Sequence, residues 1–191
     1  NALPFTTDTP SDCKAHRVVA AGRYDFQKNF ELLIRLWARL APSFPDWELY
    51  IVGDGKMRAE LTALVTSLGL TGSITLATPT HQMQEVYRSS SVYAMTSRYE
   101  GLPMVLLEAQ QMGLPIVSFA CPCGPRDVIT DGRDGFLIEP GDEERFVAEL
   151  SRLMADEELR CKMGEEARKA SLRYTVDHVM AQWVELFEGL G

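Results

Sequence analysis

Cysteine and histidine are scarce in this sequence. The three histidines are widely separated, and the four cysteines stand without CxxC spacing at Cys13, Cys121, Cys123 and Cys161. Structural zinc sites and disulfide frameworks need such residues at close, recurring intervals. We therefore expect no metal in the functional site and a reducing, cytoplasmic setting, in which the full-length protein could lie peripherally at the inner membrane.

Long apolar runs and excess positive charge are missing as well. No stretch approaches the roughly 18 consecutive apolar residues of a membrane span. The formal net charge of −8 leaves no extended positive field, so we expect neither a membrane span nor nucleic acid as a partner. With 191 residues, of which 46% are hydrophobic, the chain can bury the core of one domain and is too short for two ordinary enzyme domains.

The sequence begins without methionine, and residues 1–16 form a loop-like stretch rich in Thr, Asp and Pro. This opening does not resemble a signal peptide. We expect the chain to be a fragment of a longer protein, in which residues 1–16 are a linker and residues 17–191 form one folded domain.

The sequence does contain a regular alternation of short β-rich runs with helical segments. The expected strands are 17–21, 47–52, 73–77, 92–96, 115–119 and 135–138, and the helices between them are 28–40, 56–68, 81–88, 103–112 and 126–130. Strands that alternate with helices require crossover connections, so we predict an α/β fold with a doubly wound, mostly parallel sheet of about six strands. Ligands of such sheets bind at the carboxyl ends of the strands.

Three further helices are expected at the C-terminus, over residues 143–154, 157–172 and 176–190, with Thr175 as the N-cap of the last. The last helix has an apolar stripe at Val176, Val179, Met180, Trp183, Phe187 and Leu190. We expect this stripe to pack on its own domain. The alternative is that part of it belongs against a missing partner domain.

The most informative segment is residues 97–108, where a strand ends, a glycine follows and a helix opens. Pro103 suits the first helical position, and Gly113 suits the position just past the helix end. The start of this helix presents unpaired N–H groups and a positive dipole end, which together suit a phosphate. Glu100 precedes the helix and Glu108 lies ~7–8 Å along its axis, roughly the span of a diphosphate.

Glu108 has unusually apolar helix neighbours in Met104, Val105 and Met112. A carboxylate in such a setting needs hydrogen-bond donors, which sugar or ribose hydroxyls would provide. The plainer alternative is that the glutamate at the helix N-terminus interacts favourably with the helix dipole, while the other glutamate is simply exposed to solvent.

A second group of candidates follows the first strand, where Arg23 and Lys28 offer two cations for a diphosphate. The alternative is a solvated loop arginine and an ordinary surface lysine. Residues 52–55 hold a lone GxG without the third glycine of a dinucleotide fingerprint, so we interpret them as a tight turn. Residues 121–126 hold a CxC that we interpret as a rigid turn.

Five motifs in this order along the chain resemble those of the retaining glycosyltransferases of GT-B fold, particularly family four. Residues 100–108 resemble the E-x7-E motif of that family. The other matching segments are Gly22-Arg23 with Lys28-Asn29, residues 52–55, residues 113–117 and residues 131–137. The resemblance covers almost the whole chain from Arg17 onward.

This resemblance implies the Rossmann-like, donor-binding C-terminal half of a GT-B fold. As catalytic residues, Glu100 would contact hydroxyls of the donor sugar, while Arg23 and Lys28 would grip the diphosphate. Glu108 would hold the ribose hydroxyls. The remaining donor-binding positions are Gly101, Leu102, Pro103 and Met104 along the sugar and phosphates, and Thr78 and Pro79 near the base.

The function that the resemblance implies is transfer of a hexose or N-acetylhexosamine from a nucleoside-diphosphate sugar to a hydroxyl, in polysaccharide or glycan biosynthesis. Residues 121–125 resemble members that use UDP-sugars, and no cofactor beyond the donor is expected. A glycan or lipid-linked acceptor would bind the missing N-terminal domain, so we expect the fragment alone to bind donor without completing transfer. The alternatives are a nucleotide-sugar epimerase of the same fold and a non-catalytic nucleotide-sugar-binding module.

Overall fold

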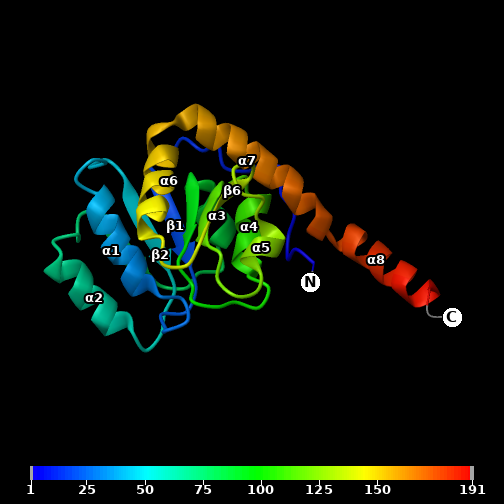
Figure 1. Cartoon of the computed structure of the whole chain (residues 1–191), viewed down its shortest axis with the longest axis horizontal. Coiled ribbons are helices and arrows are strands. Elements are labelled where there is room, and N and C mark those ends of the chain that lie inside the picture. The colour runs from blue at the N-terminus through cyan, green and yellow to red at the C-terminus, as the bar shows by residue number, and fades with distance from the viewer. Residues whose placement is uncertain (1, 190–191) are drawn as a thin grey trace.

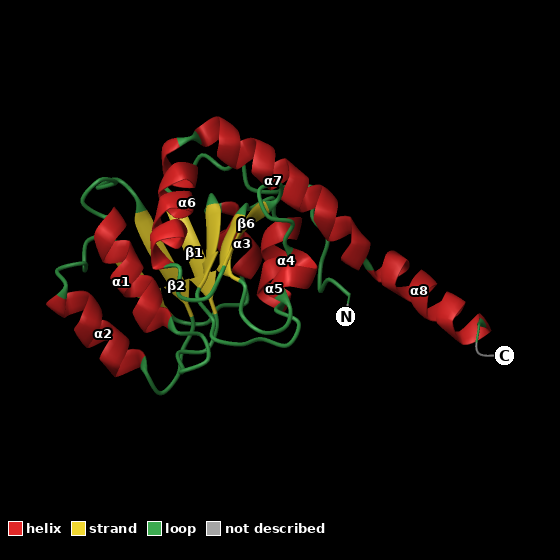
Figure 2. Ribbon diagram, in the orientation of Figure 1, coloured by secondary structure: helices red, strands yellow, loops and turns green. Residues whose placement is uncertain are grey.

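The computed structural model describes residues 2–189 and is built around a six-stranded parallel sheet (Figure 2). The strands are β1 Arg17–Ala21, β2 Glu48–Val52, β3 Ile74–Ala77, β4 Val92–Met95, β5 Ile116–Phe119 and β6 Gly135–Ile138. They lie in the order β3-β2-β1-β4-β5-β6. The prediction of a doubly wound α/β sheet of about six strands is confirmed.

Helices cover both faces of this sheet (Figure 1). They are α1 Phe30–Leu40, α2 Arg58–Ser67, α3 Met83–Arg88, α4 Met104–Gln111, α5 Pro125–Val128, α6 Glu143–Ala155, α7 Glu157–Ser171 and α8 Val176–Glu188, with a turn of 3-10 helix at Leu172–Tyr174. α1, α2 and α6 share the core on one face, and α3, α4 and α5 share the core on the other. α7 packs across α4, α6 and β6.

The strands are apolar on both sides because both sides are covered. Along β1, Val18 and Ala20 belong to one core cluster, while Val19 and Ala21 belong to the other. This alternation follows from the two-residue period of a strand. The near-continuous burial of the strands leaves polar chemistry to the segments that follow their carboxyl ends.

The sheet opens between β1 and β4, where the strand order reverses. β1 is paired with β2 along its whole length, whereas its pairing with β4 extends only through Val18 and Val19. Beyond this point the hydroxyl of Tyr93 accepts a hydrogen bond from the Ala21 N–H at 3.2 Å and lies 3.3 Å from the Ala21 carbonyl. The buried backbone is thereby satisfied while the strands part, which is the usual place for a ligand crevice.

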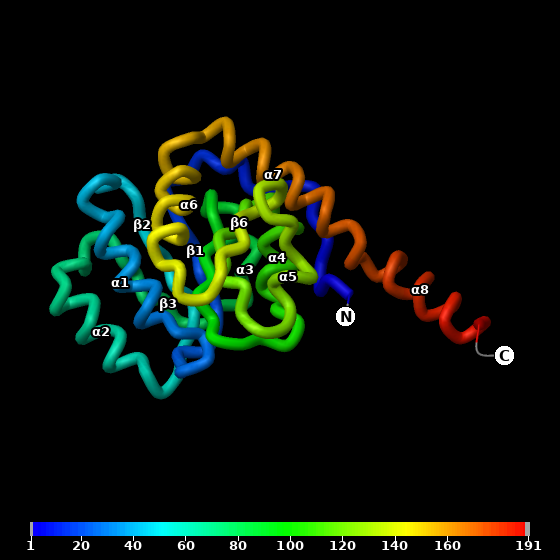
Figure 3. Tube along the Cα trace, viewed as in Figure 1, coloured from blue at the N-terminus to red at the C-terminus, as the bar shows by residue number. Residues whose placement is uncertain are grey.

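The segment before β1 has no helix or strand in residues 2–16 but is attached to the domain. Figure 3 shows it running beside α7. Leu3 is buried, and its N–H donates to the Tyr174 carbonyl at 2.8 Å. The guanidinium of Arg160, itself buried, donates to the Cys13 carbonyl at 3.1 Å.

α8 extends away from the rest of the domain (Figures 1 and 2). None of its described residues is buried, and Met180 and Phe187 are 54% and 65% exposed. The expectation that its apolar stripe packs on its own domain is therefore wrong, because α8 leaves the sheet and lays no face against it; Leu190 lies outside the described residues. Thr175 does hold the N-cap position, but its hydroxyl donates backward to the Leu172 carbonyl.

The first five helices, α1 to α5, start one or two residues away from the expected positions. α1 begins at Phe30 because Asn29 adopts a left-handed conformation, with φ +54°. α4 begins at Met104, so that Pro103 lies just before the first helical residue, while Gly113 follows the helix end with φ +75° as expected. Within residues 2–189, no helix has the length and apolar character needed to cross a bilayer.

Candidate functional site

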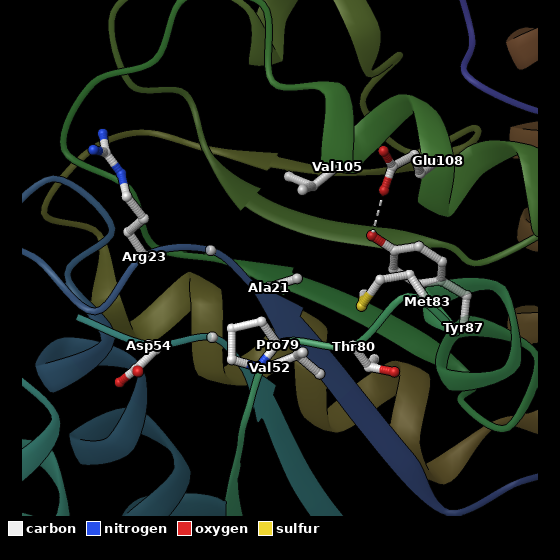
Figure 4. A pocket seen from close by; sticks show the side chains of 12 residues that line it. Ala21, Arg23, Val52, Asp54, Pro79, Thr80, Met83, Tyr87, Val105 and Glu108 are labelled. Carbon is white, nitrogen blue, oxygen red and sulfur yellow. Dashed lines mark hydrogen bonds between the residues drawn. The ribbon is translucent and has the colours of Figure 1, made fainter.

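A cavity of about 320 Å³ lies at the carboxyl ends of the central strands (Figure 4). Residues that follow β1, β2 and β3 form one side of it, and α3 and α4 form the other. Its lining residues are Ala21, Gly22, Arg23, Val52, Gly53, Asp54, Pro79, Thr80, Met83, Tyr87, Val105 and Glu108. A mainly apolar wall with a few polar groups is typical of a small-molecule site.

Arg23 and Glu108, predicted from separate motifs, line this same cavity. Figure 4 shows them at opposite ends of the view. The Arg23 side chain is 80% exposed and lies 3.6 Å from the Asp25 carboxylate, so little holds it in place. A loosely held guanidinium at the mouth of a cavity can reorient toward an incoming anion.

Glu108 reaches the cavity from the second turn of α4. Its Oε2 accepts a hydrogen bond of 2.8 Å from the hydroxyl of Tyr87, on α3. Burial raises the pKa of the Glu108 carboxyl, and the hydrogen bond from Tyr87 opposes that rise. The apolar setting predicted for this carboxylate is present, with Val105 beside it in the wall and Met112 fully buried.

Lys28 and Glu100 form an ion pair, with 2.7 Å between Nζ and Oε1. Their side chains are only 15% and 6% exposed, and Gln27 Nε2 lies 3.4 Å from the other oxygen of Glu100. Neither residue lines the cavity, but both are next to it: a Cβ placed on Gly22, which does line it, would lie 2.8 Å from Lys28 Cε. The lysine that the sequence presents as a free cation is thus already paired.

The loop that carries Lys28 is fixed by the segment after β4. The Arg98 guanidinium donates to the Asn29 side chain at 2.7 Å and to the Phe26 carbonyl at 3.2 Å. The Thr96 hydroxyl donates to the Asn29 carbonyl at 3.1 Å. These contacts connect the ends of β1 and β4 and hold Lys28 within reach of Glu100.

Gly101, Leu102, Pro103 and Met104 do not line the cavity. Gly101 and Pro103 lie instead against the loop after β5, where the Glu100 N–H donates to the Pro122 carbonyl at 3.1 Å. Leu102 and Met104 pack against the core cluster on the α4 side of the sheet. A Cβ on Gly124 would come within 2.3 Å of Pro103 Cδ, so only glycine allows this contact. No described side chain caps α4, so its first N–H groups are left for a ligand or solvent.

The expected base-binding segment is only partly in place. Pro79 lines the cavity and Thr78 does not, while Thr80 does. Met83 and Tyr87, which were not predicted as site residues, also line the cavity from one face of α3, four residues apart. The signal in the sequence is this four-residue spacing on a helix that follows a strand.

Residues 52–55 form the tight turn that was predicted, and it also contributes to the cavity. A Cβ on Gly53 would lie 1.9 Å from the Gly22 carbonyl oxygen, so the ends of β1 and β2 can approach only through glycine. Asp54 lines the cavity and pairs with Arg58 at 2.8 Å.

The CxC loop contains one buried and one exposed cysteine. Burial raises the pKa of the Cys121 thiol to about 11, while Cys123 is exposed and has φ +63°. No cluster of three or more His, Cys, Asp or Glu side chains suited to a metal occurs within the described residues.

The family model and a curated relative that match this chain are both named as glycosyltransferases. The family described as "Glycosyl transferases group 1" matches residues 7–170. The chain is 40% identical over 173 residues to the amylovoran biosynthesis glycosyltransferase AmsD of Erwinia amylovora, covering 91% of this chain and 48% of AmsD. The chain thus spans about half the length of that curated relative.

Solved structures share the fold. A crystal structure of an S. aureus TarM mutant with fondaparinux, alpha-GlcNAc-glycerol and UDP superposes with a TM-score of 0.89 at 22% identity, over 98% of this chain and 38% of TarM. The C-terminal domain of LpcC, a group 1 family protein from Francisella tularensis, superposes with a TM-score of 0.76 at 18% identity, over 91% of this chain and 97% of that domain. Because the family match extends over most of the sequence, the chain belongs to the group 1 glycosyl transferases.

Proposed function

We propose that this chain is the donor-binding half of a retaining glycosyltransferase that moves a hexose or N-acetylhexosamine from a UDP-sugar to a hydroxyl. One observation carries the proposal: Arg23 and Glu108 line the same cavity, and the Lys28–Glu100 pair borders it through Gly22. Cations near one end and a carboxylate at the other suit a ligand that has a diphosphate and a ribose.

In this proposal the nucleoside lies along the wall made by α3 and α4. The Glu108 carboxylate accepts hydrogen bonds from the ribose hydroxyls. The apolar surfaces of Val52, Pro79 and Met83 contact the base. Thr78 directly precedes Pro79 in the chain and does not itself line the cavity. A half-buried carboxylate in this apolar wall needs hydrogen-bond donors, and a vicinal diol supplies them.

The diphosphate lies between Arg23 and the start of α4. Arg23 can swing inward because it is largely exposed. Lys28 exchanges part of its contact with Glu100 for the phosphate, and Glu100 turns to hydroxyls of the sugar. The backbone along Gly101, Leu102, Pro103 and Met104 borders the sugar, with the uncapped N–H groups of α4 directed at the phosphates.

The transfer breaks the bond between the anomeric carbon and the diphosphate oxygen and forms one to the acceptor oxygen on the same face of the sugar. The proton of the acceptor hydroxyl passes to the departing diphosphate. Negative charge develops on the departing diphosphate. Once Arg23 and Lys28 have moved onto the bound diphosphate, they and the start of α4 stabilise this charge. Loss of one such donor typically costs roughly 100-fold to 1000-fold in turnover, which is the effect expected for Arg23→Ala or Lys28→Ala in the full-length enzyme.

The acceptor is assigned to the rest of the protein. AmsD, of which this chain covers 48%, is named for amylovoran biosynthesis, and TarM was solved with UDP. The UDP in TarM supports a UDP-sugar donor, and the role named for AmsD supports a glycan or lipid-linked acceptor. In this arrangement residues 1–16 connect the two halves and residues 17–191 form the donor domain.

The first experiment is a calorimetric and thermal-shift comparison of UDP, GDP and ADP with this domain. At a ligand concentration 100-fold above Kd, the stability gain is about 2.7 kcal/mol, which should raise Tm by roughly 5–10 °C. We expect UDP to bind tightest. Equal binding of the three, or none, would contradict the donor assignment.

A second experiment uses the full-length protein with a UDP-sugar, with and without acceptor. A product of retained configuration that forms only with acceptor supports the proposal. A changed UDP-sugar formed without acceptor would indicate an epimerase. Binding without turnover in either case would indicate a non-catalytic module.

A further inference from the structure

Tyr87 is held in a specific relation to Glu108. Its side chain is fully buried within the core cluster under α3 and α4, apart from the edge that meets the cavity. Its hydroxyl donates to Glu108 Oε2 at 2.8 Å, and Figure 4 shows the two side chains meeting from different helices. Among the hydrogen bonds of the described residues, neither the hydroxyl nor the carboxylate makes another.

This contact is poorly explained by stability alone. A phenol and a carboxylate placed in an apolar wall both lose hydration, and one hydrogen bond returns only part of that free energy. Apolar side chains of similar volume would fill the same space without this penalty. Ionisable groups kept in a cavity at such a cost are characteristic of functional sites.

The hydrogen bond also determines which carboxylate oxygen a ligand can use. Because Oε2 is held by Tyr87, Oε1 is left for a ligand in the cavity. The second buried tyrosine nearby cannot take over this function, since the hydroxyl of Tyr93 is bound to the backbone of Ala21. The orientation of Glu108 therefore depends on Tyr87.

We propose that Tyr87 is a positioning residue, which holds the Glu108 carboxylate so that its free oxygen meets the vicinal ribose hydroxyls of the bound nucleotide. This inference rests on the proposed function, because it assigns Glu108 to the ribose. It adds Tyr87, a residue of α3 that lies outside the sequence motifs, to the recognition of the donor.

The charge of Glu108 gives this role a pH dependence. The titratable groups that face its carboxylate are Tyr87 from α3 and Tyr93 from β4. Arg23 and Asp54, from the loops after β1 and β2, line the other end of the same cavity. Burial raises the pKa of Glu108, and the Tyr87 hydrogen bond lowers it. Removing the phenol hydroxyl therefore raises this pKa further, so the carboxylate is lost as an acceptor at a higher pH.

The test compares UDP with 2′,3′-dideoxy-UDP by calorimetry on the whole chain. We expect Tyr87→Phe to weaken UDP binding about 10-fold and to leave binding of the dideoxy compound unchanged, since that compound gives Glu108 no diol to bind. On acidification, UDP binding by Tyr87→Phe should fall off at a higher pH than in wild type. The matched control is the variant Tyr24→Phe. Tyr24 is also buried, and its hydroxyl lies within hydrogen-bond distance of the Ile51 and Ala77 carbonyls. This variant should keep the wild-type preference for UDP.

The outcomes separate this inference from the proposed function. If wild type binds neither compound, or binds both equally, the assignment of Glu108 to the ribose fails and this inference fails with it. If wild type prefers UDP but Tyr87→Phe weakens both compounds equally, or keeps the wild-type pH profile, Tyr87 has only a packing role. A Glu108→Gln background provides a second check, because Tyr87→Phe should then cause no further loss of preference for UDP.

Discussion

The Lys28–Glu100 pair allows a prediction whose size can be worked from the structure. Replacing Lys28 with Met leaves the Glu100 carboxylate 6% exposed, with one remaining contact, to Gln27 at 3.4 Å. Breaking a buried ion pair from one side typically costs about 3–5 kcal/mol. Because Lys28 keeps 15% exposure, we expect the lower end, ~3 kcal/mol, or roughly 6–12 °C in Tm.

Urea unfolding of Lys28→Met, Glu100→Gln and the double variant measures these losses in the free energy of unfolding. Since the double variant has no unpaired charge, its loss of stability should be smaller than the sum of the two single losses by ~1–2 kcal/mol. Lys169→Met is the matched control, because its pair with Glu166 has the same 2.7 Å separation but Lys169 is 64% exposed. Its effect should be far smaller. Additive effects at Lys28 and Glu100, or equal losses for Lys28→Met and Lys169→Met, would refute the reasoning.

Two further predictions concern the site and one concerns α8. Gly53→Ala should destabilise the domain by about 1–3 kcal/mol, because its Cβ would meet the Gly22 carbonyl at 1.9 Å, whereas Gly72→Ala, which points into open space, should be nearly neutral in the same urea unfolding. Arg23→Ala should leave Tm unchanged, since the side chain is 80% exposed, and calorimetry should show weaker UDP binding. Phe187→Gln should leave Tm within experimental error, because the side chain is 65% exposed, and a marked drop would show that α8 supports the domain.

The sheet was predictable because its signal is local. The continuous apolar run of β1 and the glycine at the end of α4 are each recognisable from a few neighbouring positions. The positions of Arg23 and Glu108 in one cavity were also within reach, because carboxyl ends of parallel strands meet at one edge. These arguments need no knowledge of which side chains finally touch.

The remaining features depend on contacts between distant segments. The Lys28–Glu100 and Tyr87–Glu108 hydrogen bonds join residues 72 and 21 positions apart, and nothing in the local pattern chooses those partners. The apolar stripe of α8 has the same periodicity whether it is buried or exposed. The direction of helix α8 depends on the backbone geometry at Leu172–Tyr174, which the hydrophobic pattern does not encode.

The hydroxyl of Tyr93 occupies the place that a strand backbone would take beside Ala21. The cavity floor is therefore rigid before anything binds, although the ladder between β1 and β4 has already ended there. Binding a ligand therefore need not order the backbone of this floor. Little conformational entropy is lost there, and more of the contact energy remains as affinity. The flexible elements are then Arg23 and the other exposed groups at the rim, which should govern how fast a donor is captured and released.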